Sequence, residues 1–180
     1  FDLKDLTEDT VYHRNYTNFF PSANLSYTYK SNHSVRFDYN GRTTQPTINQ
    51  LQPLRNNTDQ FNHYIGNPDL KQSFSHSINI SHNSYNFIKD RWTYQGIWSS
   101  ITQNSITNNG VLNPVNGSTT TQPVNTNGNV SAGFWSGFGM KFKKLDVRAN
   151  FSPNFNYNRF ADIIDNEKSF SNTLSAGMNI

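Results

Sequence analysis

The side chains in this sequence that could bind a metal ion are scattered rather than clustered. Only His76 and His82 fall in one predicted strand, and in an extended chain their separation is too large to hold one ion. A group of acids, Asp162, Asp165 and Glu167, lacks the alternating ligands and the glycine of a calcium loop. We therefore predict no metal site and expect surface histidines and a solvated acidic loop. The histidines are His13, His33, His63, His76 and His82.

Catalytic nucleophiles lack their usual surroundings in this sequence. Serines are abundant, but no Gly-x-Ser-x-Gly elbow occurs. Gly133, Gly137 and Gly139 do not form a phosphate-binding loop, because no helix is predicted after them. The chain has no cysteine, which excludes disulfides and thiol chemistry. The sequence therefore predicts no catalytic residue, no cofactor and no enzymatic activity.

Aromatic residues in polar stretches are the remaining candidates for ligand contact. Phe61, Tyr64 and Phe160 lie in predicted loops, where their rings could stack on a sugar or anchor the loop by packing. Packing is the more common role for such residues, and both interpretations stay open. We retain these three as candidate ligand-binding residues.

The elements that must position these residues show an alternation of apolar and polar side chains with a period of two. In residues 145–158 one face carries Leu145, Val147, Ala149, Phe151, Pro153, Phe155 and Tyr157. Successive side chains of a strand point to opposite sides, so this strand is apolar on one face and polar on the other. On the polar face of such strands we place Arg36, Asp38, Arg42 and Arg148. They could line a substrate path, pair with one another or pair with another part of the protein.

Seven segments with this alternation are joined alternately by short turns and long polar loops. We predict the short turns at Ser31–His33, Ser84–Lys89 and Lys143-Lys144, and the long loops at Gln45–Gln72, Gln103–Gly128 and Arg159–Lys168. In the fourth strand the apolar set changes phase after Trp92 and Tyr94, which predicts a bulge at Gly96. The predicted strands are Tyr12–Lys30, Ser34–Thr44, Ser73–Asn83, Asp90–Thr102, Asn129–Phe142, Leu145–Asn158 and Ser169–Ile180.

Composition favours a membrane barrel over a soluble core. Only 33% of residues are hydrophobic, yet aromatic residues make up 14%, too many for a disordered chain. No apolar run reaches the ~20 residues of a membrane helix, whereas barrel strands need only ~9–11 alternating residues. The net charge of +3 is spread out, so no nucleic-acid partner is expected. We predict an all-β, antiparallel up-and-down transmembrane β-barrel segment of about seven strands, with a soluble β-sandwich as the alternative.

Motifs around the first long loop resemble the barrel of TonB-dependent receptors of the Bacteroidota, an outer-membrane β-barrel family. Gly41-Arg42-Thr43-Thr44-Gln45-Pro46 precedes Leu51-Gln52-Pro53, and Gly66-Asn67-Pro68-Asp69-Leu70-Lys71 follows. In that family an Arg–Pro pair, a Leu-x-Pro and a Gly-Asn-Pro-x-Leu recur in this order between two strands. Phe20-Pro21-Ser22-Ala23-Asn24-Leu25-Ser26-Tyr27 is similar to the family's strand entry. The resemblance covers about residues 12–100.

The resemblance implies a barrel of about 22 strands with a plug inside it. Residues 1–180 would then be part of one outer-membrane β-barrel domain, an interior piece without the plug and the remaining strands. The implied function is uptake of an unknown nutrient across the bacterial outer membrane. Implied partners are outer-membrane lipid, the plug and missing strands, a TonB-type energising complex and a surface lipoprotein. Two other functions stay open: a soluble glycan-binding module, and a passive structural barrel.

Overall fold

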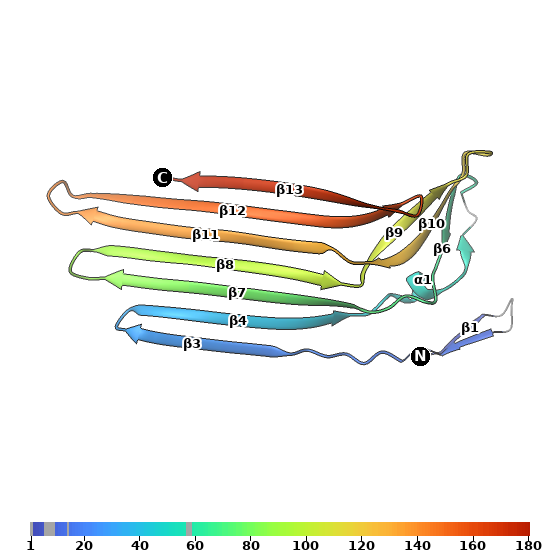
Figure 1. Ribbon diagram of the computed structural model, residues 1–180, viewed down its shortest axis with the longest axis horizontal. Coiled ribbons are helices and arrows are strands. Elements are labelled where there is room, and N and C mark those ends of the chain that lie inside the picture. Colours follow the sequence, from blue (N-terminus) through green and yellow to red (C-terminus); the bar gives the residue numbers. More distant parts are fainter. Residues whose placement is uncertain (1, 6–9, 14, 57–58) are drawn as a thin grey trace.

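The protein is all-β in the computed structural model, which describes residues 2–5, 10–13, 15–56 and 59–180. Seven long strands lie side by side, each antiparallel to its neighbours (Figure 1). Their order in the sheet follows the chain, as in an up-and-down arrangement. These strands are β3 (Ser22–Lys30), β4 (His33–Thr44), β7 (Ser73–Asn86), β8 (Arg91–Gln103), β11 (Asn129–Phe142), β12 (Val147–Ile164) and β13 (Glu167–Asn179).

The expected count of about seven strands is wrong, because the connections contain further strands. The main sheet has 11 strands and is open, with β3 and β13 at two of its edges. The additional elements are β5 (Arg55–Asn56), β6 (Asn62–Ile65), β9 (Ser105–Leu112), β10 (Thr119–Thr126) and the short helix α1 (Ile48–Leu51). A separate hairpin comprises β1 (Asp2–Asp5) and β2 (Thr10–His13).

All three predicted long loops contain regular structure, and the first of them, Gln45–Gln72, contains α1, β5 and β6. In Gln103–Gly128, β9 and β10 pair antiparallel from Ser105↔Thr126 to Leu112↔Thr119, and β10 also pairs in parallel with β6. The third loop, Arg159–Lys168, does not exist as a loop: β12 continues to Ile164 and β13 begins at Glu167. Asp165 and Asn166 make the turn with positive φ angles of 50° and 66°, which short polar side chains tolerate.

The first predicted strand starts later than expected, at Ser22 instead of Tyr12. Pro21 has no amide hydrogen to donate, although its carbonyl accepts a hydrogen bond from the amide of Gly41 at 2.7 Å. Before it, Phe19 is held by the side chain of Thr43 rather than by a strand ladder, at 3.0 and 3.3 Å. The chain therefore approaches β4 in irregular form before it joins the sheet.

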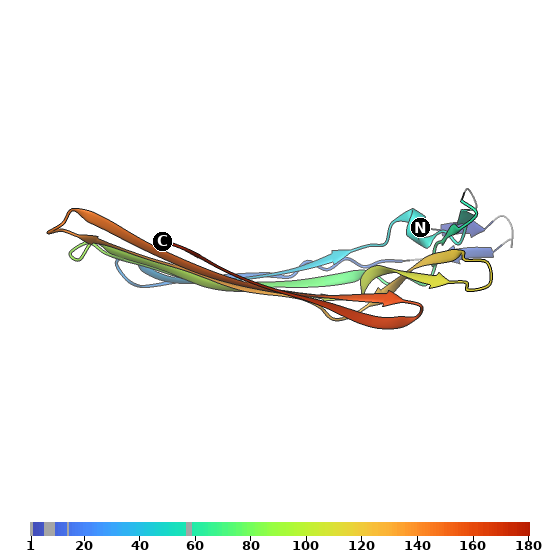
Figure 2. The same ribbon diagram turned by 90° about the horizontal axis from the view of Figure 1, so that it is seen from above.

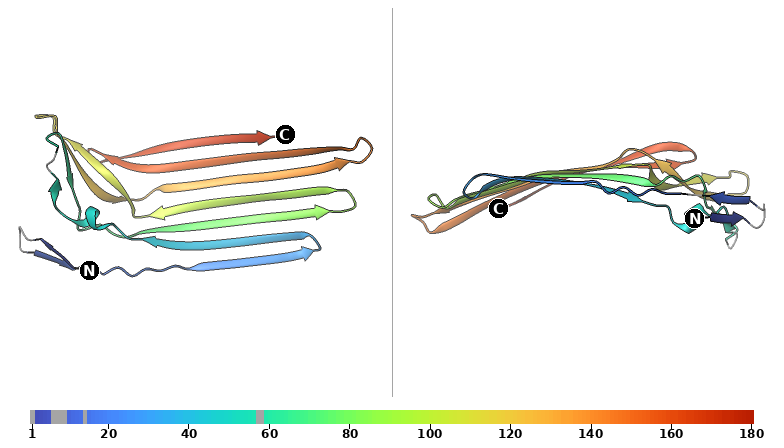
Figure 3. Two further views of the ribbon diagram at one scale, coloured as in Figure 1. Left: turned by 180° about the vertical axis from the view of Figure 1, so that it is seen from behind. Right: turned by 90° about the horizontal axis from the view of Figure 1, so that it is seen from below.

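The long strands form a single layer with no second sheet packed on them among the described residues (Figure 2). The view from below shows the same thin, twisted layer (Figure 3). Of the described hydrophobic side chains, only Leu51, Leu70 and Ala161 are fully buried. A soluble sandwich would bury its apolar face against a facing sheet. Among the described residues, no helix has the length and apolar character needed to cross a membrane.

Continuous register gives the long strands one apolar face and one polar face. From β4 to β13 no pairing between adjacent long strands shifts register, so side chains of one face stay together across the sheet. The apolar face carries Leu25, Val35, Phe37, Ile78, Ile80, Ile97, Ile101, Phe134, Phe138, Phe142, Val147, Phe151, Phe155, Leu174 and Met178. The polar face carries Arg36, Asp38, Asn79, Ser81, Ser131, Asn150, Asn154, Asn156 and Ser175.

The expected bulge at Gly96 is wrong. Gly96 pairs in unbroken register with Ser81 on β7 and with Trp135 on β11. Trp92 and Tyr94 therefore lie on the polar face, not on the apolar face where the phase change placed them. The phase change in the sequence reflects aromatic residues on the polar side of the sheet.

The two ends of the sheet differ. At one end the strands are joined by tight turns in which Asn32, Asp90 and Asp146 adopt positive φ angles of 61°, 44° and 51°. At the other end β5, β6, β9, β10 and α1 form a structured assembly, which we call the cap (Figure 1). Two of the three connections at the cap end are long, and the third is the tight turn at Asp165-Asn166. Long connections at one end only are typical of outer-membrane barrels.

Candidate functional site

Four aromatic side chains form a row on the otherwise polar face. Trp92, Tyr94 and Trp98 come from β8 and Trp135 from the neighbouring β11. The rings of Trp92 and Tyr94 are stacked, with centroids 5.1 Å apart, and Tyr94 and Trp135 follow at 5.5 Å. The row contains all three tryptophans of the chain. We call these four residues the aromatic row.

Each ring of the aromatic row lies over a glycine of the adjacent strand. The pairs that stand opposite each other are Trp92↔Gly139, Tyr94↔Gly137, Gly96↔Trp135 and Trp98↔Gly133. A Cβ atom added to any of these glycines would overlap the ring of its partner. Glycine is required here for close approach, because any larger residue would lift the ring off the backbone. The rings are consequently half-buried, although the sheet has a single layer.

Hydroxyl and amide groups border the aromatic row on β12. The Tyr94 hydroxyl lies 3.4 Å from the Ser152 hydroxyl, and Asn154 stands opposite Trp135 in the register. Asn156 stands opposite Gly133, beside the ring of Trp98. The arrangement combines flat apolar surfaces with hydrogen-bonding edges. Such a surface can stack on a planar or weakly apolar solute while the edges bind its polar groups.

The charged residues predicted for the polar face all lie on it. Arg36 donates to both carboxylate oxygens of Asp38 at 2.9 Å, but its side chain is 60% exposed, so the pair contributes little to stability. Arg42 lies further along β4. Arg148 lies on β12 beside Trp92, at a hollow of about 360 Å³ near the tight-turn end. The structure therefore does not bring the four into one cluster.

The predicted ligand-binding aromatics lie apart. Phe61 is exposed just before β6, and Phe160 is exposed on the polar face of β12. Tyr64 on β6 is half-buried, and this burial raises the pKa of its phenol. Among the described residues no ring–ring contact joins these three side chains. Their role in binding stays a prediction.

Asp59 organises the turn before β6. Its carboxylate accepts hydrogen bonds from the Asn62 side chain and from the amides of Phe61 and Asn62, at 2.8 to 3.2 Å. These bonds, that of the Asn62 side chain above all, hold the pKa of Asp59 below its usual 3.8. The backbone of this turn is also tied to β10, because the carbonyl of Phe61 accepts a hydrogen bond from the backbone amide of Thr119 at 2.6 Å. The side chain of Phe61 is exposed.

Three of the histidines take part in hydrogen bonds, whereas Nδ1 of His63 is buried without a hydrogen-bond partner in the described part of the chain. His76 on β7 lies 2.9 Å from the hydroxyl of Tyr39 on the neighbouring strand β4. His82 on β7 lies 2.9 Å from the hydroxyl of Tyr29 on β3, so this contact reaches over β4. His33 contacts the carbonyl of Ser31, and the side chain of His13 lies outside the described part. Within the described residues no three potential ligands of the His, Asp or Glu type lie close enough to hold a metal ion. Asp162 and Asp165 bind β9 instead, through Thr107 and the amide of Leu112.

The motif residues of the first long connection form the packed nucleus of the cap. Leu51 is completely buried and Leu70 is 3% exposed. Asn67 donates from its side chain to the carbonyl of Pro123 at 3.0 Å and from its amide to the carbonyl of Gln50 at 2.7 Å. At Gly66 a Cβ atom would overlap the backbone of Gln52. The Leu-x-Pro and Gly-Asn-Pro-x-Leu motifs thus fix the cap.

Sequence reasoning missed the aromatic row as a unit. It treated Trp92 and Tyr94 as apolar-face residues and considered Gly133, Gly137 and Gly139 as a phosphate-binding loop, which it excluded. The available signal was parity: with a constant register, the aromatics at even positions of β8 face glycines at odd positions of β11, and Trp135 of β11 faces Gly96 of β8. Only the alignment of the two strands reveals this complementarity.

Comparison with known proteins yields one family. The sequence model of the outer membrane protein beta-barrel family matches residues 1–179. This match extends well beyond residues 12–100, where the motifs carry the resemblance. No curated protein and no solved structure matches the chain.

Proposed function

Because the chain belongs to the outer membrane protein beta-barrel family, we propose that it forms part of the barrel wall of a TonB-dependent receptor that imports a nutrient. The protein lies in the bacterial outer membrane. In the proposed receptor the apolar face contacts lipid and the polar face lines the lumen. The cap lies outside the cell, and the tight turns lie in the periplasm.

The observation that carries the proposal is the cap. A passive barrel needs only strands and turns, whereas here the long connections are built into a packed unit at one end of the sheet. Leu51, Leu70 and Pro123 are buried in it, and Asn67 ties two connections together. Leu51, Asn67 and Leu70 belong to the motifs through which the sequence resembles TonB-dependent receptors. A structured outer rim provides a surface for ligand capture and for a surface lipoprotein partner.

The aromatic row gives the proposed lumen a specific surface. Its rings lie flat against the backbone and leave their outer faces toward the polar side of the sheet. A solute that passes along this wall would meet apolar ring faces bordered by Ser152 and Asn154. The plug of the proposed receptor would contact the same face, together with the charges of Arg36, Asp38, Arg42 and Arg148.

Nutrient depletion by living cells tests the proposal. Cells with the full-length gene, cells lacking it and cells lacking the TonB-type energising complex are grown in a defined mixture of iron chelates, cobalamins and oligosaccharides. Loss of the gene and loss of the complex should each abolish depletion of the same compound, as measured by mass spectrometry of the medium. If depletion needs the gene but not the complex, the protein is a passive barrel. If neither deletion affects any compound, the receptor proposal fails.

A further inference from the structure

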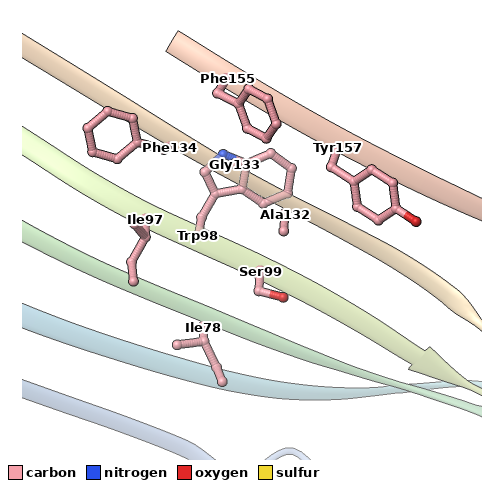
Figure 4. Close-up of a pocket in the computed structure, with 9 residues that line it drawn as sticks. All are labelled: Ile78, Ile97, Trp98, Ser99, Ala132, Gly133, Phe134, Phe155 and Tyr157. Atoms are coloured by element: carbon pink, nitrogen blue, oxygen red, sulfur yellow. The ribbon is translucent and has the colours of Figure 1, made fainter. Parts of the chain in front are cut away.

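The apolar face is interrupted by a hollow of about 330 Å³ near the middle of the sheet (Figure 4). Its floor is formed by the small side chains of Ser99 on β8 and Ala132 on β11. Larger apolar side chains form the rim, and Figure 4 shows them arranged around the floor. The rim residues are Ile78, Ile97, Phe134, Phe155 and Tyr157. We call this hollow the dent.

The dent suits a hydrocarbon chain. Its lining is almost entirely apolar, and water in it would find few hydrogen-bonding partners. Since the protein lies in the outer membrane, the surrounding medium supplies acyl chains that can fill such a space. Burial of each methylene group in a close-fitting site stabilises the bound chain through added dispersion contacts.

Two cations lie on the same face, on the cap side of the dent. Arg159 follows Tyr157 by two residues on β12, a rise of about 7 Å along the strand. Its guanidinium lies 3.9 Å from the ring centroid of Phe170, and the ammonium of Lys168 lies 5.1 Å from the same centroid. One ring therefore holds both positive charges close together. We call Arg159 and Lys168 the cation pair.

The cation pair has donors available for a ligand. The Nε atom of Arg159 is buried without a hydrogen-bond partner in the described part of the chain, so a ligand reaches it only after the side chain moves, whereas Lys168 is exposed. Neither cation forms an ion pair among the described residues. The carboxylates of the same hairpin are directed elsewhere: Asp162 binds Thr107, Asp165 binds the amide of Leu112, and Glu167 lies on the opposite face of β13 from Lys168. An unpaired charge at the edge of an apolar surface is unfavourable unless a counter-ion joins it.

We propose that the cation pair and the dent form a binding site for a phosphorylated, multiply acylated glycolipid of the outer leaflet. Its phosphate would accept hydrogen bonds from Arg159 and Lys168, and one acyl chain would occupy the dent. The proposal rests on the orientation given under the proposed function, since the cap must face outward for the cations to reach the outer leaflet. In the outer leaflet of this membrane the phosphate-bearing lipid is a glycolipid with several acyl chains, not a glycerophospholipid.

Lipid binding to the purified full-length protein tests the site without any transported ligand. Native mass spectrometry in detergent would measure the affinity of three probes: lipid A, enzymatically dephosphorylated lipid A and phosphatidylglycerol. Lipid A should bind best. The double variant Arg159→Gln/Lys168→Gln should weaken it roughly tenfold, as expected for loss of charge-assisted hydrogen bonds. Ala132→Leu, which fills the dent, should weaken binding of both forms of lipid A.

Arg91→Gln is the matched control, because Arg91 is an exposed cation of the same face at the tight-turn end. Equal loss of binding in Arg91→Gln would show non-specific charge attraction and overturn the proposal. Equal binding of the dephosphorylated lipid would overturn the phosphate contact. If phosphatidylglycerol binds as tightly and responds to the same substitutions, the glycolipid assignment is wrong. The heat-dependent shift in gel migration verifies that each variant is folded. Nutrient uptake is not measured in these experiments, so failure of the lipid site and failure of the proposed receptor function can be told apart.

Discussion

The contact between the aromatic row and its glycines predicts that one added methyl group destabilises the sheet. In Gly137→Ala the new Cβ atom would overlap the ring of Tyr94, so the ring must leave the backbone. Overpacking of this kind costs about 1–3 kcal/mol. Replacement of a glycine within a strand contributes roughly 0.5–1 kcal/mol in the opposite direction. We therefore expect a net loss of about 1 kcal/mol in the free energy of unfolding, measured by denaturant titration of the full-length protein in lipid bilayers.

Gly110→Ala is the control, because the added Cβ would meet only the Thr119 methyl group, at an ordinary 3.6 Å. This variant should be neutral or more stable than the wild type. In a Tyr94→Ala background the penalty of Gly137→Ala should disappear, since no ring remains to be displaced. A penalty that persists in that background, or Gly137→Ala as stable as the wild type, would refute the proposed contact.

Four further predictions concern the faces and the ends of the sheet. Phe151→Arg should block assembly in cells, because a lipid-facing charge costs ~2–4 kcal/mol, whereas Ser152→Arg should assemble; equal assembly would reverse or abolish the face assignment. Val115→Cys, in the cap and 92% exposed, should react with an impermeant thiol reagent on intact cells, and Ile88→Cys, in a tight turn and 85% exposed, should not. The tryptophans of the aromatic row should be quenched by iodide but only weakly by brominated lipid, as fluorescence would show. Asp59 orders its turn only while ionised, so the two amides that it binds should lose protection against hydrogen exchange, relative to their intrinsic exchange rates, as the pH falls through its lowered pKa. The same loss should occur at neutral pH in Asp59→Ala, and unchanged protection would contradict this.

The long strands were predictable because each carries its own period-two pattern. The predicted range Asn129–Phe142 agrees with β11, and the three tight turns lie where polar turn residues indicated them. The all-β class is confirmed by the family match and by the strands themselves. Alternation within one segment needs no knowledge of its neighbours, which explains this success.

The errors arose where structure depends on a partner segment. The strands β9 and β10 contain mostly Asn, Thr and Gly, so no apolar alternation marks them, and backbone pairing with β6 and β12 orders them. Asp165-Asn166 has the composition of a tight turn, but its acidic neighbours suggested a longer loop. The aromatic row was missed because Trp92 and Tyr94 were assigned to the apolar face. Their actual partners, the glycines of β11, lie about 40 residues away in the chain.

The alternating order of rings and glycines specifies the register in which β8 and β11 pair during assembly. In the native register every ring faces a glycine. A slip of two residues in one direction would place Trp98 against Trp135, and a slip in the other direction would place Tyr94 against Trp135. Either slip would also place Gly96 against another glycine, Gly137 or Gly133, and leave a gap. A wrongly paired intermediate would therefore combine a steric clash with a void and dissociate sooner than the correct pair, although both registers present the same apolar face to lipid.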